Sequence, residues 1–363
     1  MKIFAVDARL LFASGIGSYL RNILTRIRPH IPAELGLIGN PEEIRKIFSD
    51  VMIIPERSNT YSPLWHLKAP FKIPPSRLFW SPHYSVPLTP IKAKSTITTI
   101  HDLFHIRFAH MYGPASRLYA KLLMKKALKS DRIITVSQFT KQEILDIFHV
   151  DEEKIHVIYN GVDTGLFRPS PSKETLRKYT IDKPYILYVG NIKPHKNLKT
   201  LVKAFDLIKD EEDVRLVIVG KIEGLKTPDM ELLRLIEENP QLKDRIRILE
   251  HVPIEDLPAI YTHALFLVFP SLYEGFGLPP LEAIACGTPV ILSDIPVLRE
   301  IYGDDAPYFS PQNYRELADL MLQFIRNEKL RSATVDKLKH LPKKYSWEKS
   351  AMEHLNVFNG FLI

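Results

Sequence analysis

Short apolar runs rich in valine, isoleucine and leucine recur along the chain and alternate with amphipathic stretches of helical period. In the second half the runs are Tyr185–Val189, Arg215–Val219, Arg245–Leu249, Ala264–Phe269 and Pro289–Leu292, and helices are predicted near 198–210, 229–238, 255–262, 277–286 and 296–302. Uninterrupted apolar strands separated by helices are typical of parallel sheets covered on both faces. The second half therefore predicts a doubly wound α/β domain.

The first half shows the same alternation less regularly. Its predicted strands are Lys2–Asp7, Val51–Ile54, Leu78–Trp80, Ser95–Ile100, Arg132–Val136 and Lys154–Ile158. A chain of 363 residues has the length of two ordinary domains, and the polar, proline-containing stretch Asp163–Lys173 separates the two patterns. We expect domains over 1–165 and 173–344, followed by a last amphipathic helix. Right-handed crossovers would bring the loops after the strands to one edge of each sheet.

The stretch from Glu274 to Glu282 is the most informative segment of the second domain. It joins a buried-type strand to a helix and places two carboxylates eight residues apart around Gly-Phe-Gly-Leu-Pro-Pro. A glycine turn that opens a helix leaves backbone N–H groups and the positive end of the helix dipole free to bind an anion. Carboxylates beside an anion site suit a ligand that has both phosphates and hydroxyls, as a sugar nucleotide does.

At this segment the chain resembles the retaining glycosyltransferases of family 4, whose signature is a glutamate, seven residues and a second glutamate. The resemblance implies the GT-B fold, in which two Rossmann-like domains face each other across a cleft and the C-terminal helix, here 345–363, packs back on the N-terminal domain. It also implies roles for the signature. Glu274, with Gly275, Phe276 and Gly277, would contact the transferred sugar, and Glu282 would contact the ribose.

A second glycine-containing turn follows the first predicted strand. Gly15 and Gly17 open a helix there, which would let backbone approach a phosphate closely. Position 20 is leucine, so the glycine fingerprint of nicotinamide-binding domains is absent. A plain tight turn explains the pair as well; the family resemblance implies that this loop meets the donor diphosphate.

His101 ends the strand Ser95–Ile100 and would face the ligand edge of the first sheet. By itself a histidine here is more often structural than a group that hydrogen-bonds a hydroxyl. The family resemblance implies a histidine here that contacts the transferred sugar, and we assign His101 to catalysis together with Glu274.

The loop after Tyr185–Val189 carries Asn191 and Lys196. A lysine at the start of a helix can neutralise a diphosphate leaving group, and the family resemblance implies that role for Lys196. The family pairs it with an arginine just after the glycine, where this chain has Asn191, so the second half of the phosphate site departs from the pattern. His251 and Val252, after Arg245–Leu249, would lie on the side of the base.

Nothing in the sequence indicates a metal ion or a cofactor besides the donor substrate. The 13 histidines are scattered, no Asp-x-Asp pattern occurs, and the single cysteine, Cys286, excludes an intrachain disulfide. The cysteine lies in the predicted signature helix and is expected to be a small buried thiol.

The net charge of +7 comes from an excess of lysine and arginine in the first half of the chain. A predicted helix over 115–129 carries Arg117, Lys121, Lys125, Lys126 and Lys129 beside leucines. This pattern favours either a solvated helix face or contact with an anionic membrane surface. No motif indicates nucleic acid. Met1 leads directly into the first strand and no apolar run approaches the roughly 20 residues of a membrane span, so we expect a cytoplasmic protein, peripheral on the membrane if attached to it.

We therefore expect a metal-independent hexosyltransferase. The appearance of the loop 190–197 and of the segment at His101 favours mannose from GDP-mannose, moved to a hydroxyl of a glycan or lipid-linked acceptor, as in polysaccharide or lipopolysaccharide biosynthesis. The sequence leaves open a UDP-sugar-dependent glucosyl or N-acetylglucosaminyl transferase, a nucleotide-sugar epimerase on the same fold, and a non-catalytic sugar-nucleotide-binding protein.

Overall fold

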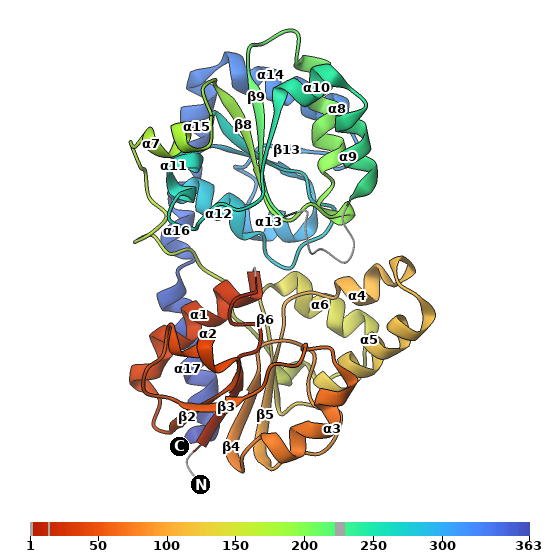
Figure 1. Ribbon diagram of the computed structural model, residues 1–363, viewed down its shortest axis with the longest axis vertical. Coiled ribbons are helices and arrows are strands. Elements are labelled where there is room, and N and C mark those ends of the chain that lie inside the picture. The colour runs from red at the N-terminus through yellow and green to blue at the C-terminus, as the bar shows by residue number, and fades with distance from the viewer. Residues whose placement is uncertain (1–2, 14, 222–228) are drawn as a thin grey trace. The chain divides into compact units, whose positions relative to one another are not determined.

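The computed structural model describes residues 3–13, 15–221 and 229–363, and the chain divides into two compact units. Unit 1 comprises Met1–Asn160 and Trp347–Ile363, and unit 2 comprises Gly161–Ser346 (Figure 1). Each unit is built around its own parallel sheet. The predicted α/β class with two doubly wound sheets is confirmed.

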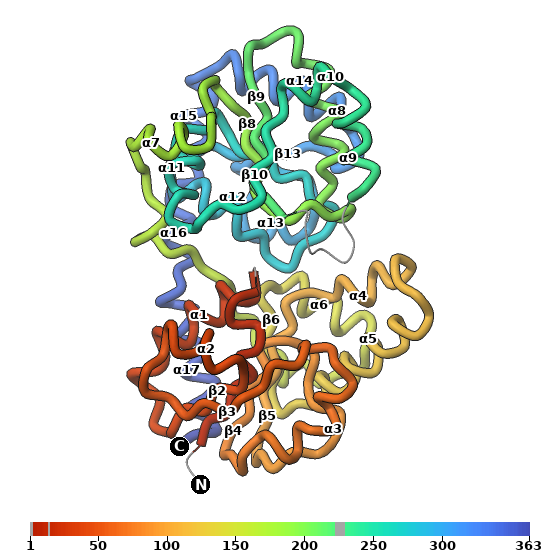
Figure 2. The backbone as a smooth tube through the Cα atoms, viewed as in Figure 1, coloured from red at the N-terminus to blue at the C-terminus, as the bar shows by residue number. Residues whose placement is uncertain are grey.

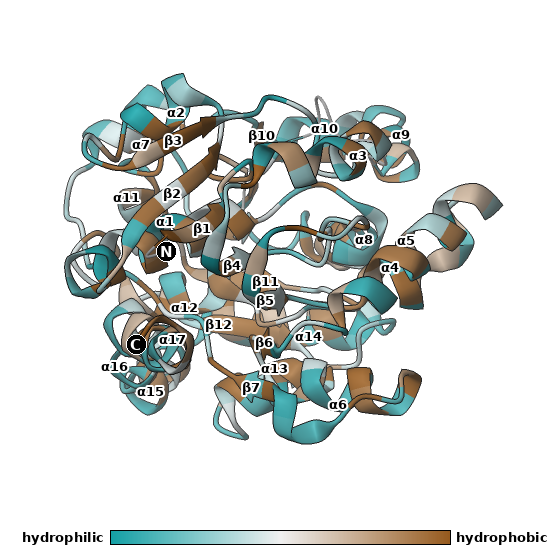
Figure 3. Ribbon diagram, turned by 90° about the horizontal axis from the view of Figure 1, so that it is seen from below, coloured by the Kyte–Doolittle hydropathy of each residue, from teal (hydrophilic) through white to brown (hydrophobic). Residues whose placement is uncertain are grey.

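Unit 1 contains a seven-stranded parallel sheet in the order β3-β2-β1-β4-β5-β6-β7. Its strands are β1 (Ile3–Asp7), β2 (Glu34–Gly39), β3 (Met52–Pro55), β4 (Ser76–Ser81), β5 (Ala93–Ile100), β6 (Arg132–Thr135) and β7 (Ile155–Val157). Its α-helices are α1 (Gly15–Ile27), α2 (Pro41–Arg45), α3 (Pro63–Lys72), α4 (Phe104–Arg107), α5 (Pro114–Ala127), α6 (Gln138–Ile147) and α17 (Trp347–Leu362). Several strands, among them β1, β2 and β3, are brown in Figure 3, as expected of a sheet with both faces covered.

The last helix, α17, belongs to unit 1 although it lies at the other end of the sequence (Figure 2). It packs beside α1, and the ring of Phe358 lies 5.0 Å from that of Phe4 and 4.9 Å from that of Trp80. Tyr19 donates its hydroxyl to Nε2 of His354 at 2.5 Å, because Nδ1 of that ring already donates to a carbonyl. The C-terminal segment thus completes the core of unit 1, as the family resemblance implied.

Unit 2 contains a six-stranded parallel sheet in the order β10-β9-β8-β11-β12-β13. Its strands are β8 (Tyr185–Val189), β9 (Arg215–Val219), β10 (Ile246–Leu249), β11 (Phe266–Phe269), β12 (Val290–Ser293) and β13 (Tyr308–Phe309). Its α-helices are α7 (Glu174–Lys178), α8 (Leu198–Ile208), α9 (Met230–Glu237), α10 (Pro240–Arg245), α11 (Leu257–Thr262), α12 (Leu278–Ala285), α13 (Pro296–Tyr302), α14 (Tyr314–Arg326), α15 (Glu328–Leu338) and α16 (Leu341–Lys344). The strands predicted for the second half match β8 to β12 within two residues at each end.

Two strands were not predicted. β2 reads Glu-Leu-Gly-Leu-Ile-Gly, with one β-branched residue, no aromatic residue and two glycines in six positions, so its sequence has a weak β pattern. β13 spans only Tyr308–Phe309 and is a strand because it pairs with β12. Both depend on pairing with neighbouring strands, which a local pattern does not report.

The strand orders fix where ligands are expected. In each sheet the chain first adds strands on one side of a central strand and then reverses to the other side, which places a switch point between β1 and β4 in unit 1 and between β8 and β11 in unit 2. The loops that leave neighbouring strands in opposite directions diverge there, and open α/β sheets bind ligands at the carboxyl ends of strands at this point. No helix among the described residues has the length and apolar character needed to cross a membrane.

Candidate active site

The switch point of unit 2 brings together the two residues that the sequence placed at the donor phosphate and sugar. The loop after β8 carries Lys196 and the loop after β11 carries Glu274, and Nζ of Lys196 lies 2.7 Å from Oε1 of Glu274. The two side chains retain only 19% and 11% of their exposure. The ion pair therefore joins the two diverging loops at the position where this topology binds ligands.

Backbone contacts between the same two loops hold Lys196 in place. Asn197 adopts a left-handed conformation with φ of 57°, and its side-chain amide donates to the carbonyls of Pro270 at 3.0 Å and Pro311 at 2.7 Å. The N–H of Leu272 donates to the carbonyl of His195 at 2.8 Å. Asparagine tolerates this conformation better than most residues. The position of the lysine relative to Glu274 is thus set by a local network rather than by the ion pair alone.

The glycines of the signature segment shape the start of α12. Gly277 precedes the helix with φ of 91°, and a Cβ built there would lie 2.8 Å from Cδ2 of Leu298. Its carbonyl accepts a hydrogen bond from the hydroxyl of Tyr302. Gly275 is buried, and so is Phe276, whose ring packs 5.7 Å from that of Tyr345. Any ligand contact made by Phe276 would therefore come from its backbone.

Glu282 lies in α12, half-buried, and accepts a hydrogen bond of 2.7 Å from the hydroxyl of Tyr261 on α11. Burial raises the pKa of Glu282 from 4.5 to about 7, an effect that the hydrogen bond from Tyr261 offsets only in part. Near neutral pH the carboxyl is therefore close to the midpoint of its titration. Sequence reasoning missed Tyr261, since no local pattern connects it with a residue 21 positions away.

The remaining residues predicted for the donor site lie at the ends of neighbouring strands in unit 2. Asn191 follows β8, and its carbonyl accepts from the hydroxyl of Tyr188 at 3.3 Å. His251 and Val252 follow β10, where His251 is exposed and Val252 is partly so. All of them therefore lie on the carboxyl edge of the sheet, on the β8 to β10 side of the switch point.

His101 lies in unit 1, directly after β5. Its Nε2 donates to the carbonyl of Pro82 at 2.9 Å, so in the neutral ring Nδ1 carries the free lone pair. The ring stands edge-on to Tyr19 with centroids 4.7 Å apart. Burial lowers the pKa of His101, and the bond to Pro82 and the charge of Asp102 offset this in part. The ring is thus neutral near pH 7 and oriented by its neighbours.

Gly15 and Gly17 both lie in the first turn of α1, as predicted, but their surroundings differ. A Cβ at Gly17 would lie 2.8 Å from the carbonyl oxygens of Leu10 and Leu11, whereas nothing approaches within 4 Å of a Cβ at Gly15. Gly17 is therefore needed for the loop after β1 to fold across the helix. This packing role stands beside the predicted contact with the donor diphosphate, which stays a prediction.

Two further groups lie at the switch point of unit 1; the sequence offered the segment of His83 either as part of the acceptor side or as a polar loop, and it gave Arg9 no role. Arg9 binds the carboxylate of Asp7 with two hydrogen bonds, of 2.9 and 2.6 Å, and its guanidinium stacks 3.9 Å from the ring of Trp65. His83 accepts from the N–H of Ser85, so its Nε2 donates to the hydroxyl of Tyr61 at 2.9 Å. Burial lowers the pKa of His83 well below its usual value. The contacts of Arg9 with Trp65 and of His83 with Tyr61 join residues far apart in the sequence, so no local pattern signals them.

Neither a cluster of metal-ligating side chains nor a reactive thiol is found among the described residues. Within residues 3–13, 15–221 and 229–363, no group of three histidine, cysteine, aspartate or glutamate side chains could hold a metal ion. Cys286 is buried as predicted, and burial and the nearby Glu282 raise the pKa of its thiol to about 12. A thiol with so high a pKa is a poor nucleophile near neutral pH.

Two family models match the chain, and they cover different parts of it. The model described as Glycosyl transferases group 1 matches residues 172–340, and the one described as Glycosyltransferase Family 4 matches residues 55–166. The first therefore covers the ion pair and the signature segment, and the second covers His101.

Relatives with assigned names are similar over most of the chain. O-antigen chain mannosyltransferase B of Escherichia coli is 30% identical over 274 residues, which are 74% of this chain and 71% of that protein. An O-antigen chain mannosyltransferase of Salmonella typhimurium is 32% identical over 254 residues, or 70% and 66%. The structure of sucrose-phosphate synthase from Thermosynechococcus elongatus covers 99% of both chains with a TM-score of 0.80 at 20% identity, which shows the shared fold. The chain belongs to glycosyltransferase family 4 and is a hexosyltransferase of the GT-B fold.

Proposed function

We propose that the chain transfers mannose from GDP-mannose, with retention of the anomeric configuration, to a hydroxyl of a growing glycan or lipid-linked acceptor. The observation that carries the proposal is the Lys196–Glu274 ion pair at the switch point of unit 2. The choice of mannose is supported by relatives that are named O-antigen chain mannosyltransferases. The choice of GDP follows from that sugar and from the sequence of the loop 190–197.

The reaction breaks the bond between the anomeric carbon and the diphosphate oxygen and forms one between that carbon and the acceptor oxygen. The acceptor proton passes to an oxygen of the departing diphosphate and neutralises the charge that the broken bond leaves there, and the released GDP then loses this proton to water. In this scheme the ammonium of Lys196 stabilises the developing charge, which is where electrostatic catalysis has its largest effect. Glu274 orients the sugar on the same side.

The other residues bind and orient. The positive end of the helix dipole at the start of α12, where Pro279 and Pro280 carry no N–H, favours an anion, and Glu282 accepts hydrogen bonds from the ribose hydroxyls. His101, held by Pro82 with its Nδ1 lone pair free, accepts a hydrogen bond from a hydroxyl of the transferred sugar. Closure around the donor would exclude water and limit hydrolysis.

A donor screen tests this function. The protein is incubated with GDP-mannose, GDP-fucose, UDP-glucose and UDP-N-acetylglucosamine, each with and without a mixture of glycan and lipid-linked acceptors, and released nucleoside diphosphate is measured. The expected result is acceptor-dependent release of GDP from GDP-mannose. NMR of the product then gives the anomeric configuration, which we expect to be unchanged.

Each other outcome overturns a definite part of the proposal. Acceptor-dependent release of UDP would show the uridine-dependent transferase instead. Conversion of one sugar nucleotide into another without acceptor would show an epimerase, and tight binding of a donor without turnover would show a binding protein. Inversion at the anomeric carbon would overturn retention while leaving the transfer in place.

A further inference from the structure

A row of buried hydrogen bonds crosses the core of unit 1 from the sheet to the last helix. Its members are Trp80 of β4, Thr99 of β5, Tyr19 of α1 and His354 of α17, each at most 1% exposed. Nε1 of Trp80 lies 3.1 Å from Oγ1 of Thr99. The hydroxyl of Tyr19 lies 3.0 Å from the same Oγ1 and 2.5 Å from Nε2 of His354. Four elements thus share one buried polar cluster, which we call the Tyr19 network.

The partners of each group determine the direction of these hydrogen bonds. Nδ1 of His354 donates to the carbonyl of Ser350 at 2.7 Å, and burial lowers the pKa of this histidine to about 4, so the ring is neutral near pH 7 and its Nε2 accepts. The proton of Tyr19 therefore goes to His354, and the proton of Thr99 goes to Tyr19. The indole N–H of Trp80, which can only donate, goes to Thr99. Every donor in the Tyr19 network thus has an acceptor.

The ring of Tyr19 lies against the imidazole of His101. Their centroids are 4.7 Å apart and their planes stand at 89°, the edge-to-face arrangement that aromatic rings favour. The same ring also lies against three others, those of Trp80, Trp347 and His354, with centroids 6.0, 6.2 and 5.4 Å away. Both the hydroxyl and the ring of Tyr19 are therefore held in place, and two of the side chains that hold them belong to α17.

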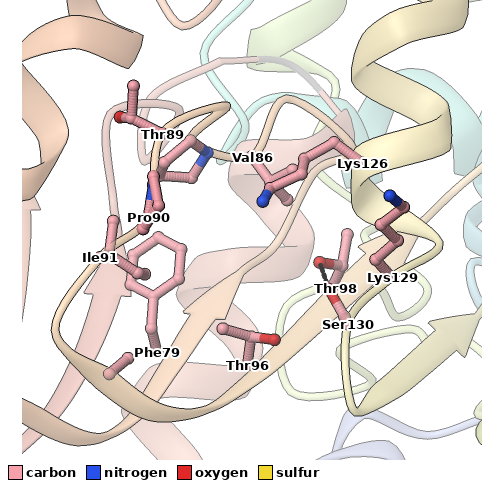
Figure 4. Close-up of a pocket in the computed structure, with 12 residues that line it drawn as sticks. Phe79, Val86, Thr89, Pro90, Ile91, Thr96, Thr98, Lys126, Lys129 and Ser130 are labelled. Atoms are coloured by element: carbon pink, nitrogen blue, oxygen red, sulfur yellow. Dashed lines mark hydrogen bonds between the residues drawn. The ribbon is translucent and has the colours of Figure 1, made fainter.

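Neighbouring threonines of β5 serve two different contacts. Successive side chains of a strand point to opposite faces, so Thr98 and Thr99 point away from each other. Thr98 lines a cavity of about 180 Å³, where its hydroxyl bonds that of Ser130 at 2.7 Å (Figure 4). Thr99 belongs to the Tyr19 network instead. The same substitution at these two positions therefore removes a buried hydroxyl on either face of one strand.

We propose that the Tyr19 network positions His101, so that Tyr19 and His354 are positioning residues of the transferase. Nε2 of His101 donates to the carbonyl of Pro82 in one orientation of the ring, and the fixed ring of Tyr19 beside it opposes rotation away from that carbonyl. The lone pair of Nδ1 is thereby kept in one place, as a preorganised site requires. The inference rests on the proposed function in giving His101 a catalytic role, but the orientation of its ring does not depend on turnover.

The titratable groups around His101 predict how its pKa responds when the network is broken. Burial, the largest effect, lowers the pKa of His101, and the charge of Asp102 raises it. His83 and His354 also interact with His101, but burial lowers the pKa of both, so they are neutral near pH 7. Burial raises the pKa of Tyr19, which therefore stays protonated. If the ring of Tyr19 moved and water reached His101, the effect of burial would shrink and the pKa would rise toward 6.5.

Nitrogen-15 NMR of the full chain with labelled histidines tests the positioning without requiring turnover. The signals of His101 are identified by their loss in His101→Gln, and in the unchanged chain we expect one tautomer with the proton on Nε2. Thr99→Val leaves Trp80 and Tyr19 without their partner, so we expect a mixture of His101 tautomers and a pKa closer to 6.5. At saturating donor, kcat should fall about tenfold with donor KM within about twofold, because a displaced group loses more in the transition state than in the ground state.

Thr98→Val is the matched control. It removes a buried hydroxyl one residue away, on the other face of β5, and should lower Tm without changing the tautomer of His101, its pKa or kcat. A second pair of variants tests the other end of the network. His354→Gln keeps an oxygen that can accept from Tyr19 and should resemble the unchanged chain, whereas His354→Leu removes the acceptor and should resemble Thr99→Val.

Three results would overturn the proposal. The first is a single Nε2–H tautomer with an unchanged pKa for His101 in both Thr99→Val and His354→Leu. The second is an equal change in Thr98→Val, and the third is a fall of kcat while the His101 signals stay as they were. If Thr99→Val does not fold, the comparison of His354→Gln with His354→Leu decides. A chain that transfers no sugar from any donor would contradict the proposed function, while the NMR signals would still show whether the network positions His101.

Discussion

The switch points of the two units share a topology but present different chemistry. In unit 2 the strand ends hold charged side chains, the Lys196–Glu274 ion pair and the Glu282 carboxyl. In unit 1 they hold the buried Arg9–Asp7 ion pair and, beside it, His101 and His83, whose burial lowers their pKa and keeps them neutral and which are each fixed by a hydrogen bond. The parallel sheet therefore determines where a ligand binds, and the side chains after each strand determine what the site does to it.

The difference between the two sets of side chains parallels two requirements of the proposed transfer reaction, one at the diphosphate and one at the sugar. In the proposed reaction the fixed charges of unit 2 would stabilise the departing diphosphate and orient the sugar, whereas the neutral histidines of unit 1 would accept hydrogen bonds from sugar hydroxyls. Removing groups from each unit should therefore have separable effects on turnover, donor affinity and stability.

The largest effect is expected from the ion pair. Lys196→Gln removes the cation that the proposed function places beside the leaving group, and turnover should fall about 10²–10³-fold, as when a preorganised charge stabiliser is removed. The measurement is kcat with a saturating donor. Lys199→Gln is the matched control, because Lys199 lies three residues away and pairs with the exposed Glu231. If Lys196→Gln turned over within a factor of two of the unchanged chain, the result would contradict a role for unit 2 in the chemical step.

His101→Gln tests unit 1. If the lone pair at Nδ1 interacts with the sugar more strongly in the transition state than in the ground state, the substitution should lower kcat about 10–100-fold with little change in donor KM. Burial lowers the pKa of His101 below its ordinary value of 6.5, so the neutral ring persists as pH falls through 6.5. The kcat of the unchanged chain at saturating donor should accordingly stay level from pH 8 down to about 6.5. A fall of kcat beginning above pH 7 would contradict the assignment.

Gly17→Ala should destabilise unit 1 by about 1–3 kcal/mol, because the added methyl would lie against two backbone carbonyls that cannot move independently. Gly15→Ala provides the control within the same turn, since its Cβ meets nothing within 4 Å. Thermal unfolding measures both. If the two substitutions lowered Tm equally, the close approach of the loop after β1 would not be the reason for the glycine.

Glu282→Gln should stabilise unit 2 at pH 8 by about 1–2 kcal/mol while weakening donor binding. The folded-state pKa of about 7 lies above the ordinary 4.5, so folding takes up a proton between these values. The destabilisation by Glu282 is thus absent below about 4.5, grows as pH rises and is complete above about 7. Denaturant unfolding at pH 8 and pH 5 measures it.

The same ionisation predicts that donor KM of the unchanged chain rises below about pH 7, because the protonated carboxyl accepts hydrogen bonds less well. Loss of this rise in Glu282→Gln would confirm its source. A Glu282→Gln protein that is less stable than the unchanged chain at both pH values would contradict the raised pKa, since Tyr261 can still donate to the amide oxygen.

Sequence alone determined much of this protein, and the reason is that strands buried on both faces leave a strong local signature. The apolar runs of unit 2 located β8 to β12, the spacing of Glu274 and Glu282 indicated a sugar nucleotide, and Gly15 and Gly17 marked the start of α1. Each of these signals lies within one strand, turn or helix. Backbone geometry over that distance follows from the residues themselves.

Only the tertiary structure decided which distant residues meet. Lys196 contacts Glu274, Tyr261 contacts Glu282 and Arg9 stacks on Trp65 because parallel strands bring remote loops to one edge of a sheet. The raised pKa of Glu282 and the lowered pKa of His101 follow from burial, and burial depends on the packing of the whole unit. The helix pattern of 115–129 allowed either a solvated or a membrane-facing surface, and the structure shows which of its leucines are exposed, Leu118 at 70% and Leu122 at 50%.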